Sequence, residues 1–512
     1  MKEIKSGSEA RKAIQRGINK ATDAVRPTLG AIGKTVMIDN GGFRPTQTDD
    51  GVTVLKSLTF SDKYENMGAH LIKEIAVKTK EVAGDGTTTA SILGQSIINN
   101  AFRIIGNDSS KVERVKQEIL KSGEHVINLI KDNTREISNE DIEHIATISS
   151  LESEVGKIIS DVIKEVGRDG TITVESSSKI GLSSEVVKGI KISSGYVSPY
   201  MAENDVCELN NPVIWIADRR ITTNQHISGI LQKVVESGKT DILIIAEDID
   251  KEALSTLVLN KMKGTFKVAA VRAPFLGTRR TDLLQDIATL TQATLISEDI
   301  GLRLEDTDIS HLGTCEKVVV NKESTVIIGG MGDVQERVAH IKKQVENESS
   351  LEDKKMLHSR VASLTGGIGV IRVGTFTESE QSTRISKIQD AVNATKAAME
   401  EGVVPGGGVT LCKIAVQIER GVVSEALAEP FKQMARNAGY SEKWWDNEIK
   451  RMVETFNTSD YGWGYDFKNR VFCDLLARGV MDPAKVTRLA ISNAVSMALS
   501  VITTEAAIIS IE

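Results

Sequence analysis

The most distinctive short motif of the chain is Gly84-Asp85-Gly86-Thr87-Thr88-Thr89, which lies between two stretches with helical spacing. The first-turn N–H groups of a helix have no partner within the helix, and the helix dipole is positive at that end. Glycine lets an anion approach the backbone, threonine hydroxyls add donors, and the Asp85 carboxylate can hold Mg²⁺ that bridges phosphates. The motif therefore predicts a phosphate site. A plain helix–turn–helix with a threonine cap explains it equally well, and no Walker-type GxxxxGK[ST] accompanies it.

Three further positions have side chains or backbone suited to the same chemistry. Gly406-Gly407-Gly408 allows a close approach of the backbone to a nucleotide, although a flexible joint is the commoner role of an isolated triple glycine. Asp390 lies on a predicted helix with Lys387 and Lys396, where a solvated face is the default. Asp50 lies in a predicted turn, and aspartate is common in turns whether or not it has a function. By themselves these residues do not define a site.

A helix predicted at residues 251–263 carries more apolar surface than a surface helix needs. Its apolar side chains spread over about two-thirds of the circumference, against the ~100° stripe of an ordinary surface helix. They are Ala253, Leu254, Leu257, Val258, Leu259 and Met262. Complete burial in a layered domain and an exposed binding surface are both consistent with this pattern.

The elements that must position these residues begin with a helical block. Apolar residues at steps of three or four predict a helix from Ala10 to Val25, which Pro27 ends. Residues 35–39 alternate as a strand, and Asn40-Gly41-Gly42 predicts the turn of a hairpin. The helices that follow are predicted at 64–82, at 87–105 and onward to about residue 131.

The middle of the chain is predicted to contain strands as well as helices. Strands are predicted at 171–174 and 185–192, and we place a domain boundary near Gly189. The following alternation predicts a βαβ layer: strand 242–246, helix 251–263, strand 267–271, helix 280–290 and strand 295–296. Beyond a strand at 370–373 and a long helix at 383–401, the remainder is predicted as helical until a final strand at 507–511. Helical ends around a mixed middle indicate that both termini build one domain and that the middle is inserted into it.

Length and composition agree with a large multidomain protein. At ~150 residues per domain, 512 residues predict about three domains and exclude a small disulfide-stapled scaffold. The content of 40% apolar and 26% charged residues argues against a disordered chain, and 41 Gly against 8 Pro indicate long helices with glycine joints. With 63 Lys+Arg against 70 Asp+Glu, the net charge of −7 repels phosphate backbones, so we expect no nucleic-acid partner.

The compartment is predicted from the cysteines and the hydropathy. The four cysteines are isolated in sequence, which predicts free thiols in a reducing environment and no zinc site. The N-terminal residues run straight into charge without the apolar stretch of a signal peptide, and no run approaches the ~18 apolar residues of a membrane span. We therefore expect a soluble, cytoplasmic protein without a membrane partner.

In their order along the chain, these motifs resemble the group I chaperonins, the GroEL-like ring ATPases that assist protein folding. The resemblance runs over nearly the whole chain. It rests on Thr28-Leu29-Gly30, Asp50-Gly51, Tyr64 to Ala69, Gly84 to Thr89, Ile244 to Asp248, Leu284 to Thr291, Glu400 to Gly408 and Asp482 to Arg488.

The resemblance implies an α+β multidomain chaperonin fold. A helical equatorial domain would comprise residues 1–131 and 402–512. A small intermediate domain would comprise residues 132–188 and 367–401. The α/β apical domain, at 189–366, would be inserted between them, with hinges at glycines such as Gly189, Gly366, Gly367 and Gly402.

The same resemblance implies an ATP site in the equatorial domain, with Mg²⁺ held by Asp85 and with K⁺ as a further cofactor. Its ATP-binding residues would be Thr28, Leu29, Gly30, Ala31, Asp49, Gly51, Asp85, Gly86, Thr87, Thr88, Thr89, Gly407, Asp466, Phe467 and Asp482. Gly407 would lie near the ribose and Asp482 would accept its hydroxyls. Asp466 and Phe467 would border the adenine.

Two aspartates would carry the hydrolysis in this family-based interpretation. Asp390, on the intermediate domain, would swing over the nucleotide, and Asp50 would help it to orient the attacking water. Such catalysis works by positioning and electrostatics, without a covalent intermediate.

The apical domain would capture non-native polypeptides on an apolar surface, for which a co-chaperonin lid would compete. The counterparts of this polypeptide-binding surface are Tyr196, Val197, Tyr200, Met201, Leu231, Leu254, Val258 and Leu259. This role would explain the surplus apolar face of the helix at 251–263.

Several residues depart from the family pattern. Ala31 stands in place of a usual proline and Asp49 in place of a usual basic residue, so we expect nucleotide affinity or monovalent-ion dependence to differ. Ser228 replaces a leucine on an apical helix, which predicts weaker substrate or lid binding. Lys468 and the residues after it diverge next to the adenine contacts. Trp444-Trp445 lies in the region of ring-to-ring contact, so single-ring and double-ring assembly both stay open.

The resulting prediction is an ATP-dependent molecular chaperone. The chain would form a homo-oligomeric, seven-membered ring or rings, capture non-native polypeptides and promote their folding in an enclosed chamber through ATP hydrolysis. The alternative is a divergent paralogue that acts as a holdase or scaffold without a productive folding cycle. A small-molecule kinase is disfavoured because nothing in the sequence resembles a second substrate pocket.

Overall fold

The computed structural model describes residues 2–39, 45–168, 170–203, 205–298, 301–348, 350–454 and 461–510. The chain divides into two compact units, which are described separately below. The first comprises residues 1–161, 176–182 and 373–512, and the second comprises 162–175 and 183–372. The division into five equatorial, intermediate and apical segments stays a prediction. The turn predicted at Asn40-Gly41-Gly42 lies outside the described residues.

The first unit is mainly helical. Its helices are α1 (Gly7–Val25), α2 (Gly51–Ser57), α3 (Lys63–Ala83), α4 (Thr87–Ile105), α5 (Val112–Asp132), α6 (Asn139–Ser150), α13 (Glu378–Glu401), α14 (Val409–Ala415), α15 (Val422–Leu427), α16 (Glu429–Asn437), α17 (Glu442–Glu454) and α18 (Ala484–Ile502), with short 3₁₀ turns at Arg26–Thr28 and Ser109–Lys111. Its strands are β1 (Lys2–Ser6), β2 (Val36–Ile38), β3 (Thr46–Thr48), β15 (Val403–Pro405), β16 (Trp463–Asp466), β17 (Val471–Asp474), β18 (Met481–Pro483) and β19 (Ala506–Ser510).

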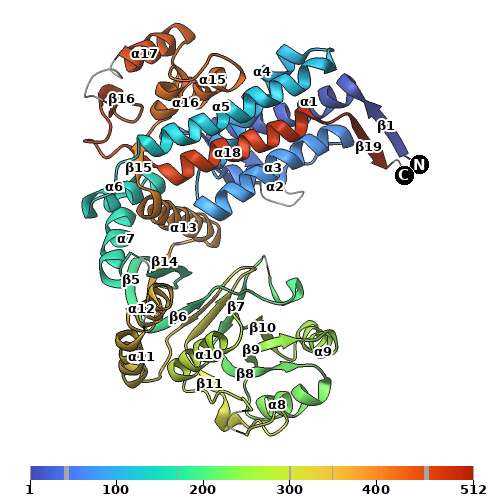
Figure 1. Ribbon diagram of the computed structural model, residues 1–512, viewed down its shortest axis with the longest axis vertical. Helices are drawn as coiled ribbons and strands as arrows, with labels where there is room; N and C mark the ends of the chain where they lie inside the picture. The colour runs from blue at the N-terminus through green and yellow to red at the C-terminus, as the bar shows by residue number, and fades with distance from the viewer. Residues whose placement is uncertain are drawn as a thin grey trace. The chain divides into compact units, whose positions relative to one another are not determined.

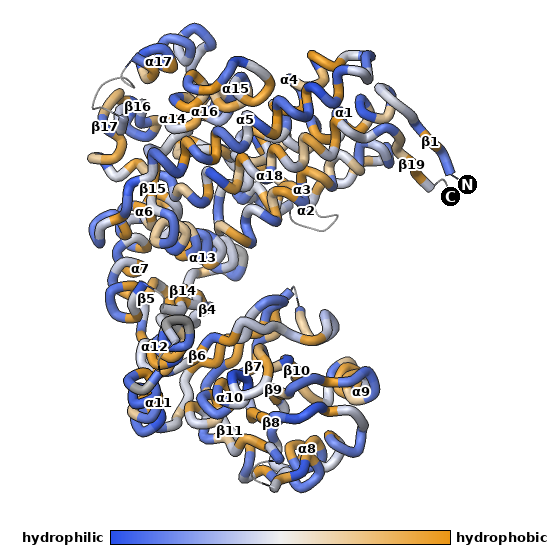
Figure 2. The backbone as a smooth tube through the Cα atoms, in the orientation of Figure 1, coloured by the Kyte–Doolittle hydropathy of each residue, from blue (hydrophilic) through white to orange (hydrophobic). Residues whose placement is uncertain are grey.

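The core of the first unit is a bundle of α1, α3, α4, α5 and α18 (Figure 1). The apolar positions that predict α1 are all buried, and Figure 2 shows the alternating polar and apolar bands of helices with one buried face. α1 and α3 cross at two glycines. A Cβ on Gly17 would lie 1.8 Å from the backbone oxygen of Glu65, and one on Gly68 would lie 2.1 Å from that of Ile14. The close crossing therefore requires glycine on both helices.

The two ends of the described chain pair with each other. β1 and β19 run antiparallel, from Lys2 opposite Ser510 to Ser6 opposite Ala506, and the N and C labels lie side by side in Figure 1. A second antiparallel pair, β2 with β3, leads into α2. The segment from β3 to the start of α2 lines the same cavity as the loop between α3 and α4.

The second unit holds the mixed middle of the chain. Its helices are α8 (Asn224–Glu236), α9 (Lys251–Met262), α10 (Thr278–Thr291), α11 (Gln335–Asn347) and α12 (Leu351–Thr365), with 3₁₀ turns at Pro199–Met201 and Ile309–His311. Its strands are β6 (Gly189–Ile192), β7 (Cys207–Asn210), β8 (Val213–Ile221), β9 (Asp241–Ile249), β10 (Lys267–Arg272), β11 (Gly313–Thr314), β12 (Lys317–Val320) and β13 (Thr325–Ile328). Four elements run across the boundary between the units: α7 (Ser153–Val166), β4 (Thr171–Ser176), β5 (Gly181–Val187) and β14 (Ile368–Gly374).

A parallel layer confirms the predicted βαβ pattern. β8, β9 and β10 are parallel, in a sheet of order β10-β9-β8-β11, while β6, β13, β12 and β7 form an antiparallel sheet. Because successive side chains of a strand point to opposite faces, Leu243 and Ile245 enter one core. Ile242 and Ile244 enter another, beneath α8 and α9. A sheet covered on both faces explains the continuous apolar run of β9.

The structure corrects three sequence expectations. The strand predicted over 185–192 is two strands, because β5 ends at Val187 and β6 starts at Gly189. The strand predicted at 295–296 is only an isolated bridge between Ile296 and Ala217. The C-terminal part is not wholly helical, since β15, β16, β17 and β18 interrupt it. Strands of three or four residues are too short to show a period-2 pattern.

The four cysteines are free and buried, which confirms the expectation of free thiols. Nowhere in the described ranges does a helix combine the length and apolarity that crossing a membrane would need.

Candidate active site

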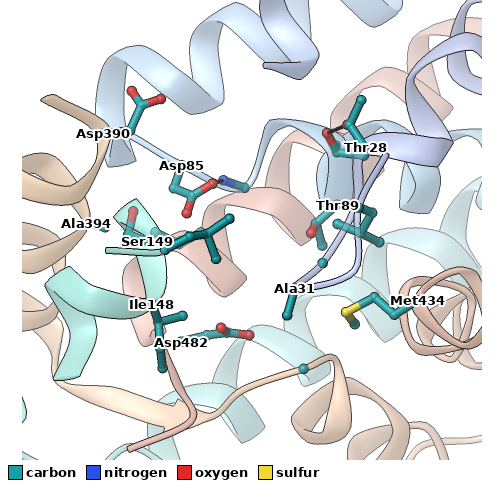
Figure 3. Close-up of a pocket in the computed structure, with 18 of the residues that line it drawn as sticks. Thr28, Ala31, Asp85, Thr89, Ile148, Ser149, Asp390, Ala394, Met434 and Asp482 are labelled. Carbon is teal, nitrogen blue, oxygen red and sulfur yellow. Dashed lines mark hydrogen bonds between the residues drawn. The ribbon is translucent and has the colours of Figure 1, made fainter. Parts of the chain in front are cut away.

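Every residue predicted for nucleotide binding or hydrolysis lines one cavity of about 970 Å³ in the first unit (Figure 3). This volume lies within the range of small-molecule sites, ~300–1,000 Å³. The lining comes from the segment after α1, the start of α2, the α3–α4 loop, α6, α13, the triple-glycine turn, β16 and β18. The fold thus brings together side chains that are separated by more than 400 positions in the sequence, such as Thr28 and Asp482.

The α3–α4 loop has the geometry of an anion site. Gly84 ends α3 at φ 78° and Gly86 is the N-cap of α4 at φ 83°, both in the left-handed region that favours glycine. Asp85 lies between them, and its Oδ1 accepts a hydrogen bond of 2.6 Å from the Gly86 N–H. Within the described residues no side chain caps α4. The first-turn amides at Thr87–Thr89 are therefore not capped by a threonine, which leaves them available to an anion.

Two more glycines keep the cavity open beside this loop. A Cβ on Gly51, the first residue of α2, would lie 2.5 Å from Oγ1 of Thr88. Gly30 has φ 87°, and a Cβ there would lie 2.6 Å from the side chain of Met434. Thr28 and Thr88 approach each other with 3.3 Å between their Oγ1 atoms. The Thr28 hydroxyl donates to the carbonyl oxygen of Val25 at 2.9 Å, so the Thr88 hydroxyl is the one of this pair with a proton to donate elsewhere.

Asp50 has two roles in the structure. It is the N-cap of α2, where Oδ2 accepts hydrogen bonds from the N–H of Thr53 at 2.9 Å and from its hydroxyl at 2.6 Å. Its other oxygen, Oδ1, lies 3.2 Å from Nζ of Lys80, and the same Nζ lies 3.1 Å from Oδ2 of Asp390. The ammonium of Lys80 therefore joins the two aspartates expected to orient water.

The sequence analysis did not single out Lys80. The signal that could have found it is its place on α3, one helical turn before Gly84 and therefore on the approach to the phosphate loop. Its two partners are 30 and 310 positions away in the sequence, so no local spacing identifies them.

The carboxylates have different electrostatic environments. Desolvation would raise the pKa of Asp50, but Lys80 and the hydrogen bonds from Thr53 outweigh it and lower that pKa. Desolvation, together with the nearby charges of Asp85 and Asp50, raises the pKa of Asp390 to about 7, although Lys80 opposes this. Desolvation also raises the pKa of Asp85. The cavity therefore gathers carboxylates that are costly to ionise without a bound cation.

Asp49, which departs from the family pattern, is paired in the structure. Its Oδ2 lies 2.7 Å from Nζ of Lys387 on α13. The additional negative charge next to the cavity is thus neutralised by a residue of the same unit.

The opposite side of the cavity is built by the pairing of β15 with β18. Val404 lies opposite Asp482, which places this carboxylate beside the triple-glycine turn, where the Gly407 N–H donates to it. Desolvation and the charge of Asp85 raise the pKa of Asp482 to about 7. Asp482 is therefore a hydrogen-bond acceptor that faces the cavity from the strand β18 (Figure 3).

Asp466 and Phe467 line the cavity in a different manner from Asp482. Asp466 is buried, and its carboxylate accepts hydrogen bonds from the N–H of Lys468 at 2.9 Å and from the backbone and side chain of Asn469 at 3.1 and 2.7 Å. The carboxylate thus caps its own turn. Phe467 packs in an aromatic cluster with Phe431 and Tyr465. Asp466 and Phe467 therefore shape the wall of the cavity.

The raised pKa values predict how the nucleotide-free protein responds to pH. A carboxyl whose pKa is higher in the folded state stabilises the fold at low pH, and this contribution is lost as pH rises from about 4 to about 7. We expect Asp482→Asn to raise the apparent Tm at pH 8 by at least about 2 °C, and by less at pH 5. Thermal unfolding of wild type, D482N and the exposed control Asp446→Asn tests this. A D482N effect that is equal at both pH values would contradict it.

The residues of the cavity fit a magnesium-bound nucleotide. Among the described residues no group of three or more His, Cys, Asp or Glu side chains is arranged to hold a metal by itself. Mg²⁺ is often held by one or two carboxylates together with phosphate oxygens, and Asp85 lies next to the amides suited to phosphates. The arrangement therefore suits Mg²⁺ that binds together with the phosphates of a nucleotide.

The predicted polypeptide-binding residues lie in the second unit, but not all are on its surface. Tyr200 is 72% and Leu259 is 55% exposed, whereas Met201 and Leu231 are buried in the core beneath α8 and α9. The other four, Tyr196, Val197, Leu254 and Val258, are half-buried. Met262, 73% exposed on α9, extends the apolar surface and was not assigned to it from the sequence. Figure 2 shows apolar residues on α9, which is not fully buried.

Comparison with known proteins agrees with this fold. The family model of the TCP-1/cpn60 chaperonin family matches residues 21–512, and the chain therefore belongs to this family. Membership supports a chaperone role, in a family whose members are ATPases.

Two solved structures are similar over 99% of both chains, with 24% sequence identity. Both are of the chaperonin gp146 from the bacteriophage EL 2 (Pseudomonas aeruginosa), in the presence of ATP-BeFx. The TM-score is 0.69 for crystal form II and 0.61 for crystal form I. At this identity the likeness establishes the chaperonin fold alone.

Proposed function

We propose that this protein is an ATP-dependent molecular chaperone that assembles into rings. It captures non-native polypeptides on the apolar surface around α9 and promotes their folding through ATP binding and hydrolysis. The observation that carries the proposal is the single cavity in which the uncapped start of α4, Asp85 and the Asp50–Lys80–Asp390 group meet. The seven-membered ring, the co-chaperonin lid and the cytoplasmic location belong to the proposal by resemblance to the family.

In this proposal the chain's residues bind and orient, and they form no covalent bond. The first-turn amides of α4 and the hydroxyl of Thr88 would hold phosphate oxygens beside Thr28, and Asp482 would accept the ribose hydroxyls. Asp85 would hold Mg²⁺, which supplies charge neutralisation of the phosphates. Asp390 and Asp50 would orient a water for in-line attack. K⁺ is included as a further cofactor by resemblance.

The experiment that tests the function is refolding of an aggregation-prone client. A folding chaperone returns active client only with ATP, and its yield depends on a co-chaperonin if a lid is used. The native mass of the assembly, with and without ATP, measures the size and number of rings. Recovery of no active client, together with suppressed aggregation, would reject the folding cycle.

One observation supports the holdase alternative. Ser228 is exposed on α8, which packs beside α9, so this position adds no apolar area to the capture surface. A smaller apolar surface would bind clients more weakly. A holdase would suppress aggregation without ATP-dependent release, so the refolding experiment separates the two functions.

The capture surface leads to a prediction of its own. Replacing Leu259 by serine should weaken binding of an unfolded client by about three- to tenfold, because an exposed apolar side chain is removed from the contact. Val416→Ser is the matched control, since Val416 is 54% exposed in the other unit. Client affinity measured by fluorescence anisotropy should change for L259S alone. Equal losses in both variants would reject the α9 surface.

A further inference from the structure

Lys80 is the cation placed between the two aspartates of the proposed hydrolysis site. Its Nζ donates to Oδ1 of Asp50 at 3.2 Å and to Oδ2 of Asp390 at 3.1 Å. The three groups come from α3, the N-cap of α2 and α13. The two carboxylate oxygens can therefore be no farther apart than the sum of these two distances, a spacing at which two negative charges need a cation between them.

Lys80 contacts two residues of the cavity wall without being part of the wall itself. Asp50 and Asp390 line the cavity, whereas Lys80 is not part of its lining. Its ammonium is therefore not placed to contact a bound phosphate, and its contacts are with the two aspartates. An ammonium carries three N–H donors, and two of them are used in this way.

The carboxylate of Asp390 depends on this contact. Its second oxygen, Oδ1, is buried and accepts no hydrogen bond from the described residues, so Lys80 is the group seen to hold this side chain. The other charges that act on Asp390 are Asp85, in the α3–α4 loop, and Asp50, and both are negative. Lys387, one turn away on α13, is engaged by Asp49. Without Lys80, repulsion would turn Asp390 away or favour its protonated form.

We propose that Lys80 is a positioning residue for ATP hydrolysis, which holds the carboxylates of Asp50 and Asp390 in place through its hydrogen bonds to both. This inference rests on the proposed function of the cavity. Lys80 bonds to the groups that would orient water and is not among the residues that line the cavity, so its loss should act on turnover much more than on binding.

The test compares purified full-length variants. Lys80→Met keeps the length of the side chain and removes its charge, and Lys80→Arg keeps the charge. Lys78→Met is the matched control, because Lys78 is an exposed lysine on the same helix for which the described ranges show no ion pair. We expect K80M to lower kcat by at least about tenfold while the affinity for ADP changes by less than about threefold. K80R should recover part of kcat, and K78M should match wild type.

Two readouts separate positioning from a merely structural role. The acid limb of the kcat profile should move to higher pH by about one unit or more in K80M, because Asp390 then protonates more easily. In nucleotide-free protein, the loss of Tm between pH 5 and pH 8 should be larger in K80M than in wild type. Adding Asp390→Asn to K80M should reverse this increase, since no like-charged pair then remains.

The outcomes distinguish the inference from the proposed function. If wild type hydrolyses ATP and K80M has the same kcat and pH profile, the inference about Lys80 is wrong, whereas the proposed function stands. A K80M variant that loses ADP affinity and turnover equally also overturns it, because Lys80 would then support the fold of the cavity. A wild type that hydrolyses no ATP rejects the proposed function first, and the role of Lys80 in hydrolysis with it.

Discussion

Replacing Asp390 by alanine should leave ATP binding within about threefold of wild type and slow hydrolysis by at least about 100-fold. Asp390 lines the cavity from α13, and its carboxylate is fixed by Lys80. A carboxylate in this place can orient water and accept its proton. The phosphates would be held by backbone amides and by the Mg²⁺ on Asp85, which the substitution does not touch. Single-turnover hydrolysis and equilibrium ATP binding, measured on the same preparation, provide the two quantities.

The control for this prediction is Glu380→Ala, a change at an exposed carboxylate in the first turn of the same helix. E380A should retain the turnover of wild type. Hydrolysis that persists in D390A would remove Asp390 from the reaction. Loss of turnover in both variants would instead show that α13 is sensitive to any substitution.

The second large effect is expected at Asp85. Asp85→Asn should lower the affinity for Mg²⁺–ATP by at least about 30-fold, because the carboxylate is the anionic ligand nearest the uncapped amides of α4. The pKa of Asp85 is raised by desolvation, which means that its charge is costly in the nucleotide-free cavity and is compensated when a cation binds. D85N should therefore also raise the apparent Tm of the nucleotide-free protein at pH 8.

Isothermal titration with ATP, in the presence of Mg²⁺ and of EDTA, measures this effect. The wild-type affinity should depend strongly on Mg²⁺, and that of D85N only weakly. Asp132→Asn, at the exposed end of α5, is the matched control and should behave as wild type. If D85N kept its Mg²⁺ dependence, the metal would have to be assigned to another carboxylate of the cavity.

The sequence predicted the long elements well because their patterns are long. α1, α3 and α4 each present several turns of regular apolar spacing, and the parallel strands β9 and β10 alternate with helices. Short strands did not have enough residues to reveal a period, and β16 and β18 were missed for this reason. The division of 185–192 into β5 and β6 depends on how those residues pair with other strands, which local pattern does not contain.

The candidate site residues, too, were predicted from the sequence only in part. The phosphate loop was singled out from its own residues, whereas the roles of Asp50, Asp390 and Asp482 came from the resemblance to the chaperonins, and all of them line one cavity. Met201 and Leu231, which were predicted to bind polypeptide, are buried. An apolar residue in a sequence does not show whether another element covers it in the fold.

What the sequence determined by itself was the chemistry available: glycines that permit left-handed backbone, threonines and amides at a helix start, and four aspartates. Only the tertiary structure decided which charged side chains lie close enough to interact. Lys80 is separated from Asp390 by 310 positions. It contacts both Asp50 and Asp390 because α3, α2 and α13 pack together. Electrostatic energy depends on distance in space, and chain separation carries no information about it.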